Sequence, residues 1–340
     1  MLPNLPCMGQ EGEQGRGAAT PGPARAAPAT GKPRPSVGAL PYARGVDELV
    51  AVEIADPVPP EEGSGAPRGP ALSPSRATDF MTCPLLYRFR VIDKLPEPPS
   101  AAAARGTLVH AVLERLFDLT AAMRTPAAAQ ALVQPEWERL SAAEPDLAAL
   151  FASEAERDTW IRDAAAAIDS YFRLEDPRRL EPADRELYVE AELESGLRLR
   201  GYIDRLDIAP AGDIRVVDYK TGKAPPPDFE ARALFQMKFY ALVLWRARGQ
   251  LPRLLQLMYL GDGQVVRYAP DEADLRATER KVQALWQAIE RAREAGDWRA
   301  RPGRLCEWCA HKPLCPEFGG TPPPLPRPGA PAGSSIGSAV

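Results

Sequence analysis

An acid and a base lie two residues apart where an apolar run ends, in the segment VVDYKTGK at residues 216–223. Successive side chains of a β-strand point to opposite faces, so Asp218 and Lys220 point the same way and Tyr219 points the opposite way. The preceding segment, GYIDRLD, carries Asp204 shortly before the turn-forming stretch APAGD. Carboxylates grouped in this way can bind a divalent cation, and a neighbouring ammonium can share the task.

The turn between these two segments decides which residues face each other. Centring it on Ala211 gives three favourable cross-strand pairs: Ile208 with Ile214, Leu206 with Val216, and Asp207 with Arg215. The same register places Asp204 directly opposite Asp218, roughly 5 Å apart on an otherwise apolar face. Oxygen ligands in that position favour Mg²⁺ or Mn²⁺. A slip of one residue would separate the acids and leave a surface hairpin with unrelated charges.

The five cysteines do not suit a disulfide framework, because their number is odd and the chain has no signal-peptide apolar region. Three of them form Cys306-x2-Cys309-x5-Cys315, whereas Cys83 lies more than 200 residues upstream and Cys7 lies near the start. A C-x2-C pair first suggests zinc. Zinc ribbons usually have two close ligand pairs, however, which this spacing does not match. His311 lies inside the loop as a possible substitute ligand, and we expect it to face solvent.

The hydrophobic period changes along the chain from helical to strand spacing. Helices are predicted over residues 101–120, 127–152, 154–175, 228–248 and 271–294, after a helical segment capped by Ser73 or Ser75. Strands are predicted over residues 186–195, 197–210, 214–221, 254–260 and 264–270. This order predicts an α/β fold, with a mixed central sheet flanked by helices and a helical insertion.

The composition is that of an ordinary globular protein, with 340 residues, 45% of them hydrophobic and 26% charged. Residues 1–70 and 319–340 are rich in Pro, Ala and Gly and are predicted to be disordered, flanking one domain over residues 71–318. No apolar run approaches the roughly 18 to 20 residues that cross a bilayer, so we expect a cytoplasmic protein without membrane contact. A net charge of −4 does not by itself indicate nucleic-acid binding, although a local cleft can still be basic.

GYIDRLD followed by VVDYKTGK resembles motifs II and III of the PD-(D/E)XK nucleases, in the RecB/AddB-type exonuclease branch. The resemblance implies a restriction-endonuclease-like core in which Asp204, Asp218 and the Tyr219 carbonyl hold Mg²⁺ or Mn²⁺. It also implies that Lys220 lies beside the attacking water. Phosphodiester hydrolysis needs such a cation to neutralise charge on the phosphoryl oxygens. RGTLVHAVLERL resembles motif I, and its His110 matches the helical histidine that completes the metal site.

Downstream, FQMKFYALVLW matches the Q-x-x-x-Y signature of the same branch and places Gln236 and Tyr240 one helical turn apart. Their implied role is to contact the DNA backbone or to order the active site. Glu114, one turn after His110, could reach the metal or be a solvated helix charge. Glu190 and Glu192 alternate along the first strand, and the sequence does not decide whether either of them faces the site.

The cysteine spacing resembles the iron–sulfur staple of AddB-type and CRISPR-adaptation nucleases, in which one cysteine before the nuclease core joins three after it. The resemblance implies a [4Fe–4S] cluster held by four thiolates, those of Cys83, Cys306, Cys309 and Cys315. Such a cluster ties distant chain segments around the nuclease core, so its loss should loosen the fold.

Over roughly residues 70–318 the resemblance implies a metal-dependent DNA nuclease, an exonuclease acting on single strands or duplex ends in DNA repair or recombination. The alternatives are a non-catalytic DNA-binding or adaptor module that keeps the fold and the cluster, and a zinc-stabilised interaction protein. The near-matches to a P-loop, at Gly31-Lys32 and Gly222-Lys223, are incomplete, so coupling to unwinding would need a separate helicase. Aromatic and basic residues near Cys83 could line a single-strand channel or form an ordinary amphipathic segment: Tyr87, Arg88, Phe89 and Arg90.

Overall fold

The computed structural model describes residues 70–326, and of residues 227–230 only the backbone. The predictions for residues 1–69 and 327–340 lie outside the described residues. Within the described part of the chain, no helix combines the length and the apolar character needed to cross a membrane.

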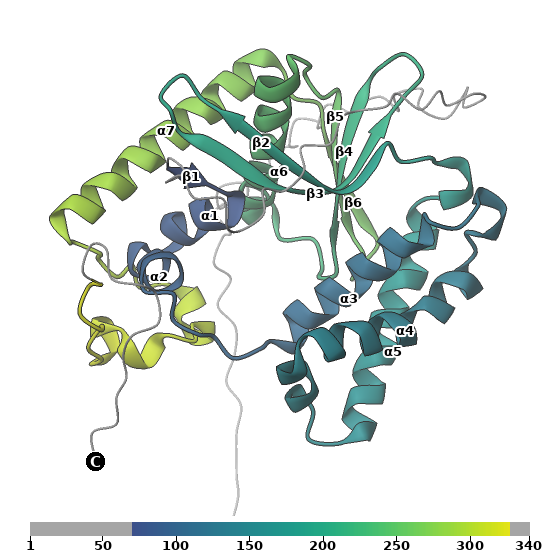
Figure 1. The fold of residues 1–340 in the computed structure, drawn as a ribbon, viewed down its shortest axis with the longest axis horizontal. Coiled ribbons are helices and arrows are strands. Elements are labelled where there is room, and N and C mark those ends of the chain that lie inside the picture. The colour runs from purple at the N-terminus through teal and green to yellow at the C-terminus, as the bar shows by residue number, and fades with distance from the viewer. Residues whose placement is uncertain (1–69, 327–340) are drawn as a thin grey trace, which may run out of the picture. The chain divides into compact units, whose positions relative to one another are not determined.

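Six strands form one mixed sheet (Figure 1). Their bounds are Ala71–Leu72 for β1, Asp184–Glu192 for β2, Arg198–Ile208 for β3, Ile214–Lys220 for β4, Leu254–Tyr259 for β5 and Gln264–Tyr268 for β6. The pairs β2–β3, β3–β4 and β5–β6 are antiparallel, whereas β1–β3 and β4–β5 are parallel. The predicted α/β fold with a mixed, helix-flanked sheet is therefore confirmed. The two-residue β1 was not predicted, because so short a strand has no period to read.

Seven α-helices accompany this sheet in residues 70–326: three pack on each face, and the four-residue α2 packs against α1. Their bounds are Pro74–Thr82 for α1, Pro84–Tyr87 for α2, Ala101–Leu116 for α3, Pro126–Ala143 for α4, Glu154–Leu174 for α5, Pro227–Arg248 for α6 and Glu272–Ala295 for α7. Ser73 and Ser100 cap α1 and α3 by accepting backbone N–H bonds. The helix predicted over residues 127–152 ends earlier, at Ala143, because Pro145 cannot continue it and begins a 3₁₀ turn.

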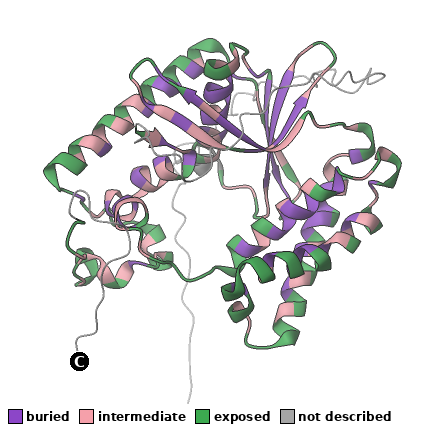
Figure 2. Cartoon of the chain, in the orientation of Figure 1, coloured by how far each residue is buried: buried purple, intermediate pink, exposed green. Residues whose placement is uncertain are grey.

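The two faces of the sheet have separate cores (Figures 1 and 2). Helices α1, α6 and α7 pack on one face, and α3, α4 and α5 pack on the other. Strand β4 supplies both cores by alternation, with Val216 facing the α6 side and Val217 and Tyr219 facing the α3 side. The strand is buried from Ile214 to Tyr219, as expected for a strand covered on both faces.

Strand β3 has an interrupted edge that makes room for a site. Strand β2 pairs with one edge of β3 from Arg198 to Leu206, so β1 and β4 must share the other edge. On that shared edge β1 pairs with residues 198–199 and β4 with residues 205–208. The stretch between them, residues 200–204, has no strand partner on this edge among the described residues. The GYID part of the GYIDRLD motif lies in this gap.

Most of the aromatic and basic segment before α3 is buried. Tyr87 and Phe89 are buried in the α6-side core, and Arg88 is buried as well. Arg88 pairs with Asp93 and donates a hydrogen bond to the Pro323 carbonyl. Tyr87, Arg88 and Phe89 therefore belong to an amphipathic segment packed on the core, whereas Arg90 is exposed and pairs with Asp79 and Glu97.

Candidate active site

The hairpin formed by β3 and β4 has the predicted register and opens at the acidic residues. The three predicted pairs are present: Ile208 with Ile214, Leu206 with Val216, and Asp207 with Arg215. The ladder ends at Arg205 and Val217, one residue before the level of Asp204 and Asp218. There the Tyr219 backbone N–H donates to Asp204 Oδ2 at 2.7 Å instead of to a backbone carbonyl of β3. The Asp204 side chain therefore replaces a ladder bond at the point where the two strands separate.

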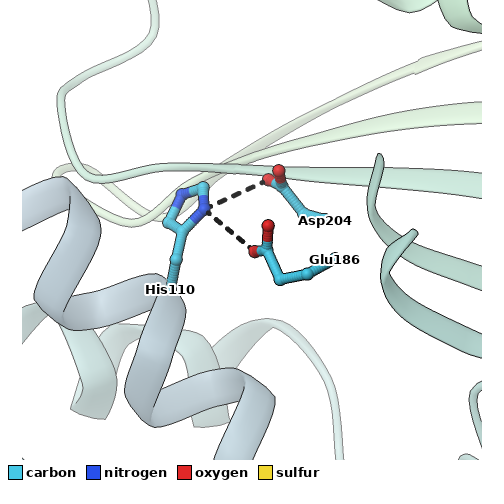
Figure 3. Close-up of side chains that lie close together, drawn as sticks. All are labelled: His110, Glu186 and Asp204. Atoms are coloured by element: carbon cyan, nitrogen blue, oxygen red, sulfur yellow. Dashed lines mark ion pairs between the residues drawn. The ribbon is translucent and has the colours of Figure 1, made fainter. Parts of the chain in front are cut away.

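Three side chains with metal-ligand atoms meet at this opening (Figure 3). His110 of α3 places Nδ1 3.6 Å from Asp204 Oδ2 and 3.8 Å from Glu186 Oε1. One ligand atom from each of the three residues lies within 4.8 Å of the others. The other ring nitrogen, Nε2, is 2.9 Å from the Tyr219 carbonyl oxygen. The two carboxylates thus meet at Nδ1, with the Tyr219 carbonyl on the other ring nitrogen, and the oxygen donors among these groups suit a hard divalent cation.

Burial and mutual charge set the protonation of this group. Burial raises the pKa of Asp204 to about 7, and repulsion from Asp218 adds to the effect. Burial would lower the pKa of His110, but the bond to Glu186 and the negative charges of Asp204 and Asp218 together raise it to about 9. Without a metal, the His110 imidazolium therefore neutralises the acids at pH 7. A cation that displaced that proton would take over the same role.

Asp218 and Lys220 form a second group on the α6 side of the opening. Lys220 Nζ is 2.6 Å from Asp218 Oδ2, and Gln236 Nε2 donates to Asp218 Oδ1 at 3.0 Å. Lys220 also donates to Gln236 Oε1 at 3.1 Å. Asp218 is only 2% exposed, so these two partners account for both carboxylate oxygens. The two predicted groups are therefore adjacent, with Asp218 held by Lys220 and Gln236 and not within the compact group around His110.

Tyr240 links the Q-x-x-x-Y helix to the GYIDRLD strand. Its hydroxyl lies 3.3 Å from Gln236 Nε2, and its ring packs against the backbone of Gly201. A Cβ at residue 201 would lie 2.8 Å from the Tyr240 ring, so only glycine fits there without a shift. The contacts run from Gly201 through Tyr240 and Gln236 to Asp218. Of the two roles implied for Gln236 and Tyr240, the ordering role is the one for which the structure supplies contacts.

A buried ionic network holds Tyr219 from behind. Arg205 is 1% exposed and donates to the Tyr219 hydroxyl at 2.6 Å. The same guanidinium pairs with Glu175 and with Asp207, so its charge is balanced where water is excluded. Burial raises the pKa of the Tyr219 hydroxyl, which keeps it neutral. Fixing this side chain fixes the backbone carbonyl that points at His110.

Glu186 is the acid that the sequence analysis missed. The β2–β3 register pairs Arg185 with Arg205 and Leu187 with Ile203, so Glu186 and Asp204 lie at the same level. Glu186 has a φ of 46°, and this left-handed residue reverses the face on which its neighbours lie. Centring the β2–β3 turn on Ser195, as was done for the next turn, would have placed Glu186 opposite Asp204.

The other acids left open by the sequence have different partners. Glu190 accepts a bond from the Tyr188 hydroxyl and pairs with Arg198, and Glu192 is exposed at the end of β2. Glu114 presents its backbone carbonyl to Arg185. In residues 70–326, none of these three carboxylates belongs to the compact ligand group.

Three cysteines of the C-terminal loop, together with the cysteine between α1 and α2, line one cavity of about 680 Å³. Cys83, Cys306, Cys309 and Cys315 are all half-buried free thiols. The backbone N–H of Arg301 donates to Cys83 Sγ at 3.4 Å and that of Gly303 donates to Cys306 Sγ at 3.3 Å. Donors of this kind stabilise thiolates bound to a metal cluster. Four thiols lining one pocket are the donor set that an iron–sulfur cluster would use.

His311 is not the solvent-facing residue that we predicted. It is 4% exposed, packs on Phe89 and places Nε2 2.8 Å from Glu97 Oε1. The prediction failed because a polar residue in a short Cys-rich loop has no periodicity that reveals its burial. The pair ties the cysteine loop to the segment that precedes α3.

With this geometry established, comparisons with known proteins become informative. The family model for the PD-(D/E)XK nuclease superfamily matches residues 71–316, so the chain belongs to that family. Nucleases of this family use divalent metal ions, in agreement with the acidic group around His110.

The individual proteins that this chain resembles share less than 30% sequence identity with it. The Gene 69 protein of Mycobacterium phage D29 is 28% identical over 52% of this chain and 69% of its own length. That of phage L5 is 26% identical over 73% of this chain and 97% of its own. A crystal structure named "Putative exonuclease" from Eubacterium rectale has 13% identity and a TM-score of 0.49 over 71% of this chain and 87% of that one.

Proposed function

We propose that this protein is a deoxyribonuclease that uses Mg²⁺ or Mn²⁺, and that it degrades single-stranded DNA or DNA ends as an exonuclease of the RecB/AddB type. We place it in the cytoplasm, in DNA repair or recombination, with any unwinding supplied by a separate helicase. The observation that carries the proposal is the meeting of His110, Asp204 and the Tyr219 carbonyl beside Lys220. Metal ligands next to an ammonium are what phosphodiester hydrolysis requires.

The proposed metal ligands are His110, Asp204, Asp218 and the Tyr219 carbonyl, to which the structure leads us to add Glu186. When bound, the metal would polarise the phosphoryl group and generate a hydroxide nucleophile. The chain's own residues would do the rest. Lys220 stabilises negative charge beside the ligands, and Gln236 and Tyr240 keep Lys220 and Asp218 in place.

The proposed staple is a [4Fe–4S] cluster on Cys83, Cys306, Cys309 and Cys315. Its support is the shared cavity, the free thiols and the N–H donors to two sulfurs. When bound, the cluster would supply covalent cross-links between the two ends of the domain. Arg301 adds a second tie between these ends by donating to the Met81 carbonyl at 2.6 Å. We propose residues 71–318 as the extent of this domain.

A nuclease assay tests the catalytic proposal. The anaerobically purified full chain would be incubated with end-labelled single-stranded and blunt duplex DNA, with Mg²⁺, Mn²⁺ or EDTA. We expect metal-dependent release of short products, lost in Lys220→Ala and kept in Lys223→Ala. Lys223 belongs to the same VVDYKTGK segment but is exposed, so it controls for general loss of positive charge. Cleavage that survives Lys220→Ala would refute the assignment of Lys220.

The alternative is a non-catalytic DNA-binding or adaptor module with the same fold. It predicts DNA binding without metal-dependent products under any of these conditions. The presence of His110, Asp204, Asp218 and Lys220 in one place argues against it. In a protein without catalytic activity, a buried pair of acids that repel each other would destabilise the fold without any function in return.

A further inference from the structure

A groove beside the candidate active site has the chemistry of a track for a single unpaired strand. It has a volume of about 790 Å³ and lies among α1, α6 and the β2–β3 hairpin. The residues that matter here are Arg76, Arg200, Tyr202, Arg232, Gln236 and Tyr240. Gln236 and Tyr240 belong also to the Asp218 group, so the groove opens directly beside the proposed metal ligands.

Positive charge in this groove is not neutralised by the protein. Its one acidic lining residue, Asp79, is already paired with Arg90 at 2.6 Å. Among the residues whose side chains the structure describes, Arg76, Arg200 and Arg232 form no ion pair with a carboxylate. Three guanidinium groups collected in one concavity repel each other unless anions enter. Guanidinium groups bind phosphate oxygens strongly, often through two bonds at once.

Tyr202 offers a flat aromatic surface at the same place. It is 49% exposed although it lies in the middle of β3, and its ring stands 5.3 Å from that of Tyr188 at 60°. Exposed single tyrosines are common and mean little alone. This one is held by a strand, lies beside a second ring and lines the same groove as the three arginines. Only an unstacked base can use such a face, because the bases of a duplex already stack on each other.

The position along the strand connects stacking with cleavage. Tyr202 precedes Asp204 by two residues, which is about 6 to 7 Å along a strand. A base stacked on Tyr202 would therefore belong to a nucleotide close to the phosphate at the metal ligands. The gap in strand pairing over residues 200–204 leaves this edge of β3 open to a ligand.

We propose that this groove binds single-stranded DNA, with a base stacked on Tyr202 and phosphates bound by Arg76, Arg200 and Arg232. The proposal deepens the nuclease function and rests on it for the orientation of the strand. It makes Tyr202 a substrate-binding residue that confers the preference for unpaired DNA.

Binding and cleavage are tested separately. Fluorescence anisotropy with a labelled oligo-dT would be measured on the full chain carrying Lys220→Ala, which removes turnover, in Mg²⁺ over a range of salt concentrations. Adding Tyr202→Ala should weaken binding about tenfold and leave the salt dependence unchanged. Tyr202→Phe keeps the ring and should bind within about twofold of the parent. Binding that is equal in Tyr202→Ala and its parent would overturn the proposal.

The arginines have a different signature. Each phosphate contact contributes about 0.7 to the slope of log affinity against log salt for single strands. Changing Arg200 to Gln should therefore reduce the slope by about 0.7, and changing all three arginines should reduce it by about 2. Arg179→Gln changes an exposed arginine that does not line the groove, and it should leave the slope unchanged. An unchanged slope in the triple variant would overturn the phosphate assignment.

Duplex DNA and turnover separate this inference from the nuclease function. A relaxed, covalently closed circular duplex, which has neither ends nor unpaired bases, should bind Tyr202→Ala and its parent equally, and an equal loss on both DNA forms would overturn the stacking role. With Lys220 present, Tyr202→Ala should raise KM for single-stranded DNA and leave kcat unchanged. A protein that binds oligo-dT through Tyr202 but never cleaves would refute the nuclease function and uphold the groove. Normal cleavage with unaltered KM in Tyr202→Ala would uphold the nuclease function and refute the role of the groove.

Discussion

The carboxylate site and the cysteine cavity are built in opposite ways. The carboxylate site, formed by His110, Glu186, Asp204 and the Tyr219 carbonyl, rests on paired strands and a packed helix. The cysteine cavity is lined by short 3₁₀ turns, whose bonds are local, such as Cys309 N–H to the Cys306 carbonyl and Cys315 N–H to the Lys312 carbonyl. The first site is held by the sheet, whereas the second is held by a few side-chain contacts, such as those of His311 with Glu97 and of Arg301 with Met81.

The difference extends to what each site costs the metal-free protein. Buried acids that repel each other lower the stability of the metal-free protein, so the packing of the sheet and its ionic networks must compensate for the carboxylate site. Half-exposed thiols carry no such cost, but loops without regular structure contribute little to holding themselves in place. Removing a ligand should therefore affect activity at the first site and stability at the second.

The largest expected effect is on activity and follows from Asp204→Asn. Loss of the carboxylate charge should lower nuclease activity by about 10³-fold or more, because charge stabilisation at the reacting phosphate is lost. The pKa of Asp204 is raised to about 7 in the folded protein, so at pH 8, where this carboxyl is ionised, its charge lowers the free energy of unfolding, whereas a neutral Asn does not. The melting temperature of the metal-free variant at pH 8 should thus be unchanged or higher. A large fall would mean that the acid is structural.

Cys306→Ser should lower the melting temperature, which Asp204→Asn should not lower. Without one thiolate the cluster should be lost, and absorbance near 400 nm should disappear with it. We expect the melting temperature to fall by about 10 °C, which corresponds to roughly 3 to 5 kcal/mol for a domain of this size. Cys7→Ser is the matched control, since Cys7 precedes the family domain, and it should change neither quantity. If the unsubstituted protein were stable, colourless and bound to zinc, the cysteines would form a zinc site and the cluster proposal would be refuted.

Glu186→Gln tests the acid that the structure added to the carboxylate site. Loss of one charged ligand should weaken Mn²⁺ binding by about 10- to 100-fold. Glu190→Gln provides the control, because Glu190 lies on the same strand and pairs with Tyr188 and Arg198 instead. Titration of the metal, followed by calorimetry, would measure both. Equal affinities in the two variants would remove Glu186 from the ligand set.

The smallest expected effect is the pH dependence of metal binding. The pKa of His110 is raised to about 9 and that of Asp204 to about 7, so both groups hold protons that a metal must displace. Mn²⁺ affinity should therefore rise with pH, by up to about tenfold per unit for each proton released, between pH 6 and pH 9. Calorimetry in two buffers of different ionisation enthalpy would count these protons. Affinity that stays flat over this range would contradict the assignment of His110 as a ligand.

Some of this organisation could be predicted from the sequence because it is local. Alternation in VVDYKTGK and one turn at Ala211 were enough to pair β3 with β4, since a hairpin register depends only on its turn and its two strands. The same reasoning at Ser195 would have found Glu186 opposite Asp204. The burial of His311 could not be predicted in this way, because it depends on contacts with Phe89 and Glu97, more than 200 residues away in the sequence.

By itself, the sequence determined the α/β order of elements, the hairpin that carries Asp204, Asp218 and Lys220, and the spacing of the cysteines. Only the tertiary structure decided that Asp218 pairs with Lys220 and Gln236 while Asp204 meets His110 and Glu186. It also decided that Tyr202 lines the same groove as Arg76, Arg200 and Arg232. The physical reason is that patterns report which face of its own element a residue occupies. The neighbour that it meets depends on how separate helices and strands pack, and that is set by the whole core.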